Sequence, residues 1–348
     1  MTAQEYDPFE PGPFGAGVAT VEVRDQSRAR TFRCELWYPS ASYPAGGGST
    51  GERSAPAEER GAPAAQGSHP LIIFSHFSGG GRRTATYLTT HLASHGYAVA
   101  AMDHSEVVAP ELGPNPAEDR DARARRIDAI ITNRVPDVRV LLATLTGPRP
   151  HSGLAGVGLD RDLIGVAGHS FGGWTALAAP EQEPRVRAVV ALAPGGSLRP
   201  VPGVLPLTLT FDWSRTVPVL ILTGDCDVPI PLEGVQDIFA RTPEPKRMFV
   251  LRRADHQHFA DNVEASHEAL RGTTLPGEAA WMTAAMLPAS ELCPGQHGHL
   301  FARGLALAHF DWALRGDAAA REFLASSAER ALAARGVDAV QYRVPAGA

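Results

Sequence analysis

The chain contains 348 residues, of which 44% are hydrophobic and 20% are charged, and this composition excludes disordered, fibrous and membrane-spanning proteins. The 32 basic and 38 acidic residues give a net charge of -6, so no general attraction to nucleic acid or to anionic membranes is expected. No apolar run approaches the roughly 18 residues of a transmembrane helix. We therefore predict a single domain over residues 1–348.

The N-terminal stretch and the cysteines bear on the cellular compartment. MTAQEYDPFEPGPFG carries acidic residues and prolines where a secretory signal would carry a basic stretch and an apolar run, so we expect a cytoplasmic protein. Cys34, Cys226 and Cys293 are widely spaced and form no C-x-x-C pair. Neither a disulfide framework nor a zinc knuckle is predicted.

The first part of the chain predicts a hairpin and a loop. Residues 18–23 (VATVEV) and 32–38 alternate apolar and polar side chains, as antiparallel strands do. Residues 40–68 are rich in Gly, Pro, Ala and Ser without periodicity, which predicts a flexible surface loop.

From Leu71 onward, short apolar runs alternate with helical segments, a pattern typical of a mostly parallel sheet covered by helices on both faces. With the hairpin, these runs predict eight strands; the six after the hairpin are residues 71–75, 97–102, 163–167, 186–192, 217–222 and 247–251. The predicted helices are residues 82–95, 119–145, 171–179, 231–240, 299–314 and 318–334.

Three segments fit neither a strand nor a regular helix and are predicted to be cap insertions over a site: residues 105–118, 195–216 and 261–298. Residues 299–348 are predicted to form C-terminal helices.

The predicted strand 163–167 leads directly into Gly168-His169-Ser170-Phe171-Gly172 and a helical segment. This is the G-x-S-x-G pattern in the context it requires, where a tight turn between strand and helix exposes the serine hydroxyl above the sheet. The start of the helix also offers backbone N–H groups to a developing oxyanion. We predict that Ser170 is a nucleophile.

A serine nucleophile needs a histidine base and a carboxylate that orients it, and in this kind of fold the chain order is Ser, acid, His. Asp225 and Asp227 both follow the strand 217–222. We favour Asp227, because it lies beyond the turn that starts at Gly224, and we interpret Asp225 as a turn-forming residue.

The loop after the last predicted parallel strand, RRADHQHFAD, contains two candidate bases. We favour His256 and keep His258 as the alternative. The second oxyanion donor is expected from the loop after the first parallel strand, SHFSGGG (75–81). That glycine run matches neither nucleotide-binding pattern, G-x-x-x-x-G-K-[ST] or G-x-G-x-x-G with a following acid.

Several longer motifs carry a family resemblance: DPF-x-x-GPF, LIIFSHFSGG, LASHGYAVAAMDH, RVPDVRVLLATL, DLIGVAGHSFGG and DHQHFAD. Over roughly residues 6–270 the chain resembles the plasma-type platelet-activating factor acetylhydrolase and dienelactone-hydrolase-like branch of the α/β-hydrolases, with cutinase-like polyester hydrolases as relatives. The resemblance implies an α/β-hydrolase fold, Ser170 as nucleophile, His256 as base, and the N–H groups of Phe171 and Ser78 as oxyanion donors.

Two departures from the family pattern matter. The acetylhydrolase position for the acid, after the strand that follows the nucleophile helix, holds no carboxylate here, whereas the cutinase-like position holds Asp227. The family usually shows His-Gly before the oxyanion residue, but this chain has His76-Phe77, so Phe77 stays a second candidate for the donor beside Ser78.

These residues predict a serine carboxylic ester hydrolase that works through an acyl-enzyme, without metal or cofactor, on a short-chain acyl ester, a phospholipid acetyl ester or a polyester. An amidase or lactone hydrolase on the same triad is the nearest alternative. A metal-dependent hydrolase using Asp255, His256, His258, His297 and His299 is weaker, because we cannot assemble three or four ligands at zinc spacing. A non-catalytic binding protein is disfavoured, because no triad residue is missing.

Overall fold

A single mixed sheet of ten strands runs through the computed structural model, which describes residues 6–42, 58–113, 115, 117–148, 152–154 and 156–344. In spatial order the strands are β10, β9, β8, β7, β6, β4, β5, β2, β1 and β3. Their bounds are β1 Gly15–Asp25, β2 Arg30–Ser40, β3 Glu58–Arg60, β4 His69–Ser75, β5 Ala98–Met102, β6 Leu159–His169, β7 Val186–Leu192, β8 Val219–Gly224, β9 Lys246–Leu251 and β10 Ala339–Tyr342.

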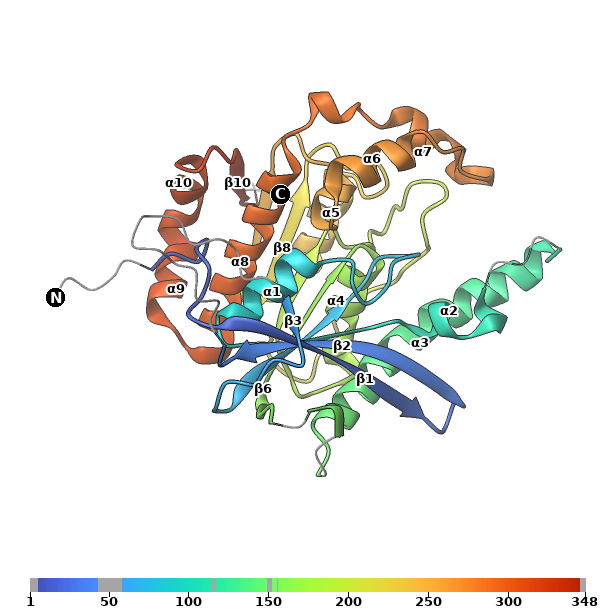
Figure 1. The fold of residues 1–348 in the computed structure, drawn as a ribbon. Coiled ribbons are helices and arrows are strands. Elements are labelled where there is room, and N and C mark those ends of the chain that lie inside the picture. Colours follow the sequence, from blue (N-terminus) through green and yellow to red (C-terminus); the bar gives the residue numbers. More distant parts are fainter. Residues whose placement is uncertain are drawn as a thin grey trace.

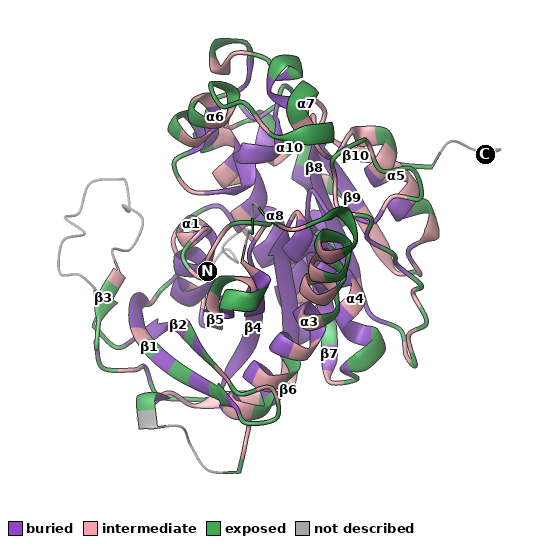
Figure 2. Cartoon of the chain, turned by 90° about the vertical axis from the view of Figure 1, so that its right-hand side faces the viewer, coloured by how far each residue is buried: buried purple, intermediate pink, exposed green. Residues whose placement is uncertain are grey.

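Strands β4 to β9 are parallel to one another, whereas β1 and β2 form an antiparallel hairpin that joins the sheet through β5. Every residue of β4, β5 and β8 is buried, as expected for parallel strands covered on both faces. Figure 2 shows these central strands inside the molecule. The predicted architecture, a mostly parallel sheet with an antiparallel N-terminal hairpin, is confirmed.

The predicted number of eight strands is wrong, because two short strands extend the edges of the sheet. Strand β3 lies within the predicted loop 40–68 and pairs with β1, and β10 lies within the predicted helical segment 299–348 and pairs with β9. Each has too few residues for an alternating pattern to be visible in the sequence. Most of the predicted loop, residues 43–57, lies outside the described residues.

Helices cover both faces of the sheet (Figure 1). Their bounds are α1 Thr86–Ser94, α2 Ser105–Val108, α3 Arg120–Leu145, α4 Phe171–Gln182, α5 Leu232–Arg241, α6 Val263–Arg271, α7 Ala280–Ala285, α8 Gly295–Arg315, α9 Ala318–Glu322 and α10 Ala328–Ala333. Alternate residues of β4 serve the two cores: Ile72 and Phe74 pack with α1 and α8, and Leu71 and Ile73 pack with α3, α4 and α5.

The three predicted cap segments differ in structure. Residues 195–216 contain neither helix nor strand, as predicted. Residues 261–298 are not irregular, because they contain α6, α7 and the start of α8, and residues 105–118 contain α2. In Figure 1, α6 and α7 lie beyond the end of β8, whereas α2 and the first half of α3 project from the body.

The C-terminal segment departs from the prediction in one more place. The predicted helix 318–334 is divided into α9 and α10 by a π-helical turn, Phe323–Ser327. None of the helices in the described ranges combines the length and the hydropathy that crossing a bilayer would require.

Candidate active site

Ser170 lies in a sharp turn between β6 and α4. Its φ of 59° and ψ of -115° fall outside the regions that residues with a side chain ordinarily adopt. Two backbone hydrogen bonds hold the turn: the Ser170 N–H donates to the Leu192 carbonyl at 2.8 Å, and the Trp174 N–H donates to the Ser170 carbonyl at 3.0 Å. Such a turn presents a serine hydroxyl at the carboxyl edge of a parallel sheet.

The two glycines of the G-x-S-x-G pattern are required by close backbone packing. A Cβ at Gly168 would lie 2.2 Å from the Gly172 carbonyl oxygen, and a Cβ at Gly172 would lie 1.9 Å from the Ser75 carbonyl oxygen. No side chain fits at such distances. The turn therefore packs directly against the end of β4, where the second oxyanion donor is expected.

Asp227 and His256 form a buried pair beside this turn. His256 Nδ1 lies 2.7 Å from Asp227 Oδ2, and Asp227 Oδ1 accepts the Ile230 N–H at 2.7 Å. Burial lowers the pKa of His256, but the charge and the hydrogen bond of Asp227 outweigh it, so this pKa lies above its ordinary value. The ring of His169, the neighbour of Ser170, has its centroid 4.6 Å from that of His256.

Asp225, the alternative acid, has a different set of partners. Its Oδ1 accepts the Arg253 N–H at 2.6 Å, and its Oδ2 lies 3.4 Å from Arg252. These bonds join two neighbouring loops, and none of them reaches His256. The geometry thus pairs Asp227, and not Asp225, with the candidate base.

His258, the alternative base, belongs to a second buried cluster. Its Nδ1 lies 2.9 Å from Asp255 Oδ1 and 3.0 Å from the Asp255 backbone nitrogen, and its Nε2 lies 2.9 Å from the Cys293 carbonyl oxygen. Burial lowers the pKa of His258, but Asp255 and Cys293 outweigh it and raise this pKa to about 10. The other carboxylate oxygen of Asp255 accepts from His267. Both ring nitrogens of His258 thus have partners within this cluster, and Ser170 is not one of them.

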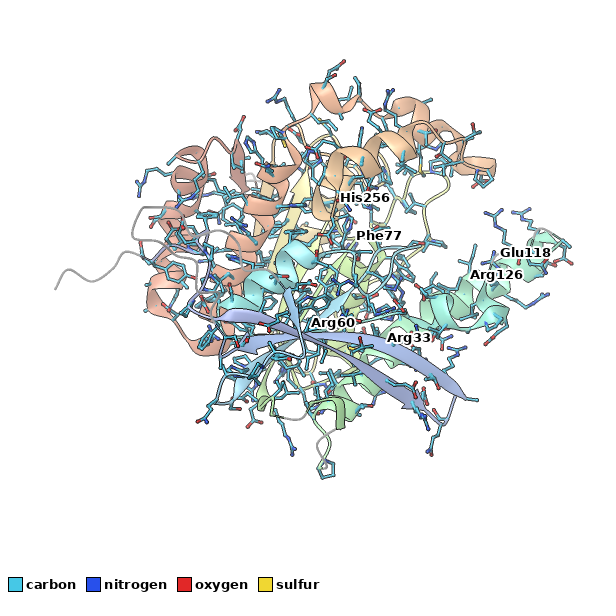
Figure 3. All side chains as sticks on the ribbon, in the orientation of Figure 1. Arg33, Arg60, Phe77, Glu118, Arg126 and His256 are labelled. Atoms are coloured by element: carbon cyan, nitrogen blue, oxygen red, sulfur yellow. The ribbon has the colours of Figure 1, made fainter. Side chains whose placement is uncertain are left out.

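The loop after β4 contains both candidates for the second oxyanion donor. Phe77 to Gly80 form a turn closed by a hydrogen bond from the Gly80 N–H to the Phe77 carbonyl at 3.0 Å, with Gly79 at a φ of 79°. Ser78 is exposed at the second position of this turn. Phe77 is partly buried, its ring 5.4 Å from that of His169, and Figure 3 labels it near His256.

Phe171, the other predicted donor, is the first residue of α4. The N–H groups of a first helical turn have no partner within the helix and point toward its N-terminal end. The Phe171 side chain itself is buried and stacks on Trp174 with ring centroids 5.5 Å apart. As the first residue of α4, Phe171 has a backbone N–H of this kind, directly after Ser170.

His169 is a residue of this site that the sequence reasoning missed. Its ring is buried between Phe77, His256 and Phe259, and among the described residues neither ring nitrogen has a hydrogen-bond partner. Burial, and then the charge of His256, hold the pKa of His169 well below its ordinary value, so the ring is neutral. It packs against the neighbouring rings as an apolar aromatic group. Its place directly before the nucleophile was the available signal.

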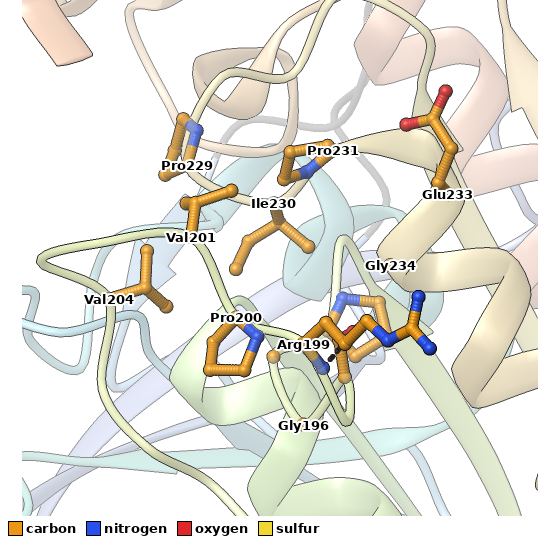
Figure 4. A pocket seen from close by; sticks show the side chains of 13 residues that line it. Gly196, Arg199, Pro200, Val201, Val204, Pro229, Ile230, Pro231, Glu233 and Gly234 are labelled. Atoms are coloured by element: carbon orange, nitrogen blue, oxygen red, sulfur yellow. Dashed lines mark hydrogen bonds between the residues drawn. The ribbon is translucent and has the colours of Figure 1, made fainter. Parts of the chain in front are cut away.

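A cavity of about 250 Å³ lies near the site (Figure 4); Ser170, Asp227 and His256 are not among its lining residues, but two of the residues that line it are hydrogen-bonded to Ser170 and Asp227. The lining includes Gly195, whose N–H donates to the Ser170 carbonyl at 3.3 Å, and Ile230, whose N–H donates to Asp227 Oδ1 at 2.7 Å. The lining is mostly apolar, with Arg199 and Glu233 as its charged members: Pro194, Gly195, Gly196, Ser197, Arg199, Pro200, Val201, Val204, Pro229, Ile230, Pro231, Glu233 and Gly234.

The aromatic residues in the predicted cap segments, and Trp174 of α4 that contacts one of them, are not among the residues that line this cavity. Trp174 donates its Nε1–H to the Thr208 carbonyl at 2.8 Å, and Trp281 donates its Nε1–H to the Pro202 carbonyl at 3.1 Å. Phe211 and Trp213 are partly buried and pack against the hydrophobic core to which α3, α4 and α5 contribute. The cap segment 195–216 is thereby fixed at several points around the cavity.

The residues of the metal-dependent alternative have other partners. His258 and His267 both pair with Asp255, and His299 Nε2 bonds to the Ala260 carbonyl while its ring stacks on Tyr87 at 3.9 Å. Within the described part of the chain, no three His, Cys, Asp or Glu side chains are grouped so that they could hold a metal ion.

Comparisons with known proteins match this chain to an acetylhydrolase family and to cutinases. The family model for "Platelet-activating factor acetylhydrolase, isoform II" matches residues 48–111. Platelet-activating factor acetylhydrolase of Canis lupus familiaris is 26% identical over 225 residues, covering 56% of this chain and 48% of that protein. A cutinase of Thermobifida alba is 24% identical over 203 residues, covering 58% and 57% respectively.

A solved structure titled as a ferulic acid esterase from Streptomyces cinnamoneus superposes with a TM-score of 0.62 at 24% identity, covering 95% of this chain and 96% of that one. At this identity the likeness establishes the fold. The parallel sheet, the strained serine turn and the structural likeness together show that the chain has the α/β-hydrolase fold. Within that class it is similar to platelet-activating factor acetylhydrolases and cutinases, and it spans about half the length of the curated relatives it matches.

Proposed function

We propose that the protein is a serine hydrolase that cleaves carboxylic esters through an acyl-enzyme. The observation that carries the proposal is the 2.7 Å contact between His256 Nδ1 and Asp227 Oδ2 beside the strained turn at Ser170. The relatives it matches are named as an acetylhydrolase and as cutinases, which supports an ester as the substrate.

Asp227 fixes the tautomer of His256 in this mechanism. Because Nδ1–H donates to the carboxylate, the lone pair of His256 is on Nε2 and can accept the Ser170 proton. Ser170 Oγ then attacks the ester carbonyl, the protonated His256 gives the proton to the departing alcohol, and water hydrolyses the acyl-enzyme by the same steps. The buried carboxylate stabilises the imidazolium that forms at each stage.

We assign the oxyanion hole to the backbone N–H groups of Phe171 and Phe77. Phe171 follows the nucleophile and begins α4, which gives it a free N–H. The Ser75 and His76 carbonyls lie against the serine turn, within 1.9 and 2.8 Å of a Cβ built at Gly172, so the next residue, Phe77, is adjacent to the nucleophile. Ser78, one residue further, belongs to an exposed turn.

The cavity beside Asp227 is the proposed site for the apolar part of the substrate. Its walls of proline, valine and isoleucine favour a hydrocarbon group, and its walls are hydrogen-bonded directly to Ser170 and Asp227. A cavity of about 250 Å³ suits a short acyl or alcohol group.

The test is a hydrolysis panel: p-nitrophenyl acetate, p-nitrophenyl hexanoate, a phospholipid with a short sn-2 chain, a polyester film and an acyl anilide. Hydrolysis of the esters, its loss by on the order of 10⁴-fold or more in Ser170→Ala, and fluorophosphonate labelling of wild type but not of Ser170→Ala are expected. The matched control is Ser326→Ala, on an exposed π-helical turn. Ester hydrolysis that persists in Ser170→Ala would overturn the proposal, and preferred cleavage of the anilide would reassign it to amides.

A further inference from the structure

We infer that Arg134 is a positioning residue for the oxyanion hole, because its buried guanidinium group contacts both peptide segments that carry the two donors. The inference rests on the proposed function. Arg134 belongs to the run RVPDVRVLLATL, which the mechanism above does not use.

Arg134 lies on α3, and its side chain is 0% exposed. Arginine is rarely fully buried unless its donors are paired. Its Nη1 donates to the His76 carbonyl at 2.8 Å and to Ser75 Oγ at 3.1 Å. Its Nη2 forms an ion pair with Glu106 of α2. The guanidinium is thus held at the end of β4 by neutral acceptors on one side and a carboxylate on the other.

The hydrogen bond to the His76 carbonyl determines the direction of the proposed Phe77 donor. The His76 C=O and the Phe77 N–H belong to one planar trans peptide unit, so they point in opposite directions. When Arg134 holds the carbonyl oxygen, the N–H is directed away from Arg134, on the side of the unit opposite α3. A charged donor on the oxygen also polarises the peptide unit and strengthens its N–H as a donor.

The second contact of Arg134 concerns the other proposed donor. Its Cζ lies 4.0 Å from the centroid of the Phe171 ring, a close cation–π contact between two buried groups. Phe171 immediately follows Ser170, so fixing its side chain fixes the start of α4 from which its N–H points. One guanidinium group therefore sets the relative position of two N–H groups that come from different elements of the fold.

A buried network of hydrogen bonds also contacts the end of β4, next to Arg134. Ser75 Oγ lies 2.9 Å from His104 Nε2, and His104 Nδ1 lies 3.2 Å from Asp137 Oδ2. The order Ser, His, Asp imitates a catalytic triad, but Ser75, His104 and Asp137 are each 0% exposed, and Arg134 donates to the serine oxygen. Since substrate has no access to Ser75, this network is a structural support for β4 and for Arg134.

The test compares Arg134→Met, which removes the charge and the hydrogen-bond donors, with Arg134→Lys, which keeps the charge but loses the planar guanidinium group and its several N–H donors. For p-nitrophenyl acetate, we expect Arg134→Met to lower kcat on the order of tenfold to a hundredfold while KM stays within about twofold of wild type. Misplaced oxyanion donors stabilise the transition state less but leave the binding of the substrate unchanged. Arg134→Lys should recover part of the loss. The Ki of a trifluoromethyl ketone, which forms an oxyanion on Ser170, should rise in proportion to the loss of kcat/KM.

The matched control is Arg315→Met. Arg315 lies 3.9 Å over the ring of Tyr97 and pairs with Asp311 at 2.9 Å, so it loses a similar set of contacts away from the site. Its melting temperature should fall while kcat and Ki stay within about twofold of wild type.

A second variant covers the possibility that Arg134→Met does not fold. Phe171→Leu keeps the backbone N–H but removes the ring that the Arg134 guanidinium contacts. It should lower kcat and raise Ki several-fold, the same directions of change as in Arg134→Met. Unchanged kcat and Ki in folded Arg134→Met, or in Phe171→Leu, would overturn this inference while leaving the ester hydrolase intact. A wild-type protein without ester hydrolysis would instead overturn the proposed function itself.

Discussion

His256 Nδ1 lies 2.7 Å from Asp227 Oδ2, and the carboxylate belongs to a side chain that is 0% exposed. The two residues come from loops that follow neighbouring parallel strands, β8 and β9, whose carboxyl ends meet at one edge of the sheet. A buried carboxylate at this distance fixes the histidine ring and stabilises its protonated form. The predictions below test what this contact and its surroundings imply.

The two aspartates that flank Cys226 should differ sharply in their effect on activity. Asp227→Asn should lower kcat for p-nitrophenyl acetate on the order of 10⁴-fold, because an amide can hold His256 in the wrong tautomer. Asp225→Asn, the matched control, should keep kcat within about tenfold, since Asp225 contacts Arg252 and Arg253 instead of His256. A larger loss in Asp225→Asn than in Asp227→Asn would reverse the assignment of the acid.

The pH dependence of kcat/KM should report the raised pKa of His256. Only neutral His256 can accept the Ser170 proton, so activity is lost as the pH falls through the pKa of the free enzyme. Because Asp227 raises that pKa above 6.5, the acid limb of kcat/KM should have its midpoint above pH 6.5. In Asp227→Asn the remaining activity should show a midpoint at lower pH. A wild-type midpoint below 6.5 would contradict this prediction.

Replacing Ser78 by proline distinguishes the two candidates for the second oxyanion donor. Ser78 is the second residue of a turn with Gly79 at positive φ, a position that proline favours. Ser78→Pro removes the Ser78 N–H while the Phe77 N–H stays. If Phe77 is the donor, kcat should stay within about tenfold of wild type, whereas loss of a donor costs about 10² to 10³. Ser78→Ala is the control for the side chain, and a loss confined to Ser78→Pro would restore Ser78 as the donor.

A larger side chain in the cavity beside Asp227 should shorten the accepted substrate. Val204 lines this cavity, so Val204→Phe should lower kcat/KM for p-nitrophenyl hexanoate on the order of tenfold while leaving the acetate within about twofold. Val107→Phe places the same ring on the exposed surface of α2 and should change neither rate. Equal rates for both esters in Val204→Phe would show that the acyl chain lies elsewhere.

The sequence predicted those parts of the fold that repeat or that obey a local rule. β7 was predicted with the bounds it has in the structure, because its apolar run, interrupted only by Arg187, is visible without tertiary information. The serine turn was predicted because its glycines form a short local pattern in the sequence, although one of the close contacts that require them, from Gly172 to the Ser75 carbonyl, is a tertiary one. Helix α6 was not predicted, although its side chains are arranged amphipathically, because it is a short element of nine residues and buries only Val263 and His267.

In the site, too, residues with a local sequence pattern were predicted and those defined by tertiary contacts were not. The order of strands and loops led to Asp227 and His256, but the choice between Phe77 and Ser78 depends on the path of one turn relative to Gly172. The role of Arg134 depends on a contact between α3 and α4 that has no local signature in the chain. His169 was overlooked because a histidine with unpartnered ring nitrogens becomes informative only once its burial is known.

The Asp255–His258 pair should make stability depend on pH in the alkaline range. The pKa of His258 is raised to about 10 in the folded protein, against 6.5 for an ordinary histidine. The folded state therefore binds a proton more tightly than the unfolded state, so the stabilisation is complete below about pH 6.5 and is lost as the pH rises through about 10. The loss should amount to a few kcal/mol, on the order expected for a shift of this direction and burial.

The measurement is urea unfolding at pH values from 6 to 10. Wild type should lose more free energy of unfolding over this range than His258→Gln, in which nothing titrates at this position. His91→Gln is the matched control: His91 is equally buried and bonded to the Pro8 carbonyl, but burial holds its pKa well below the ordinary value, so it is neutral throughout. That variant should keep the alkaline decline of wild type, since His258 is unchanged. An equal decline in wild type and His258→Gln would show that His258 is neutral in the folded protein.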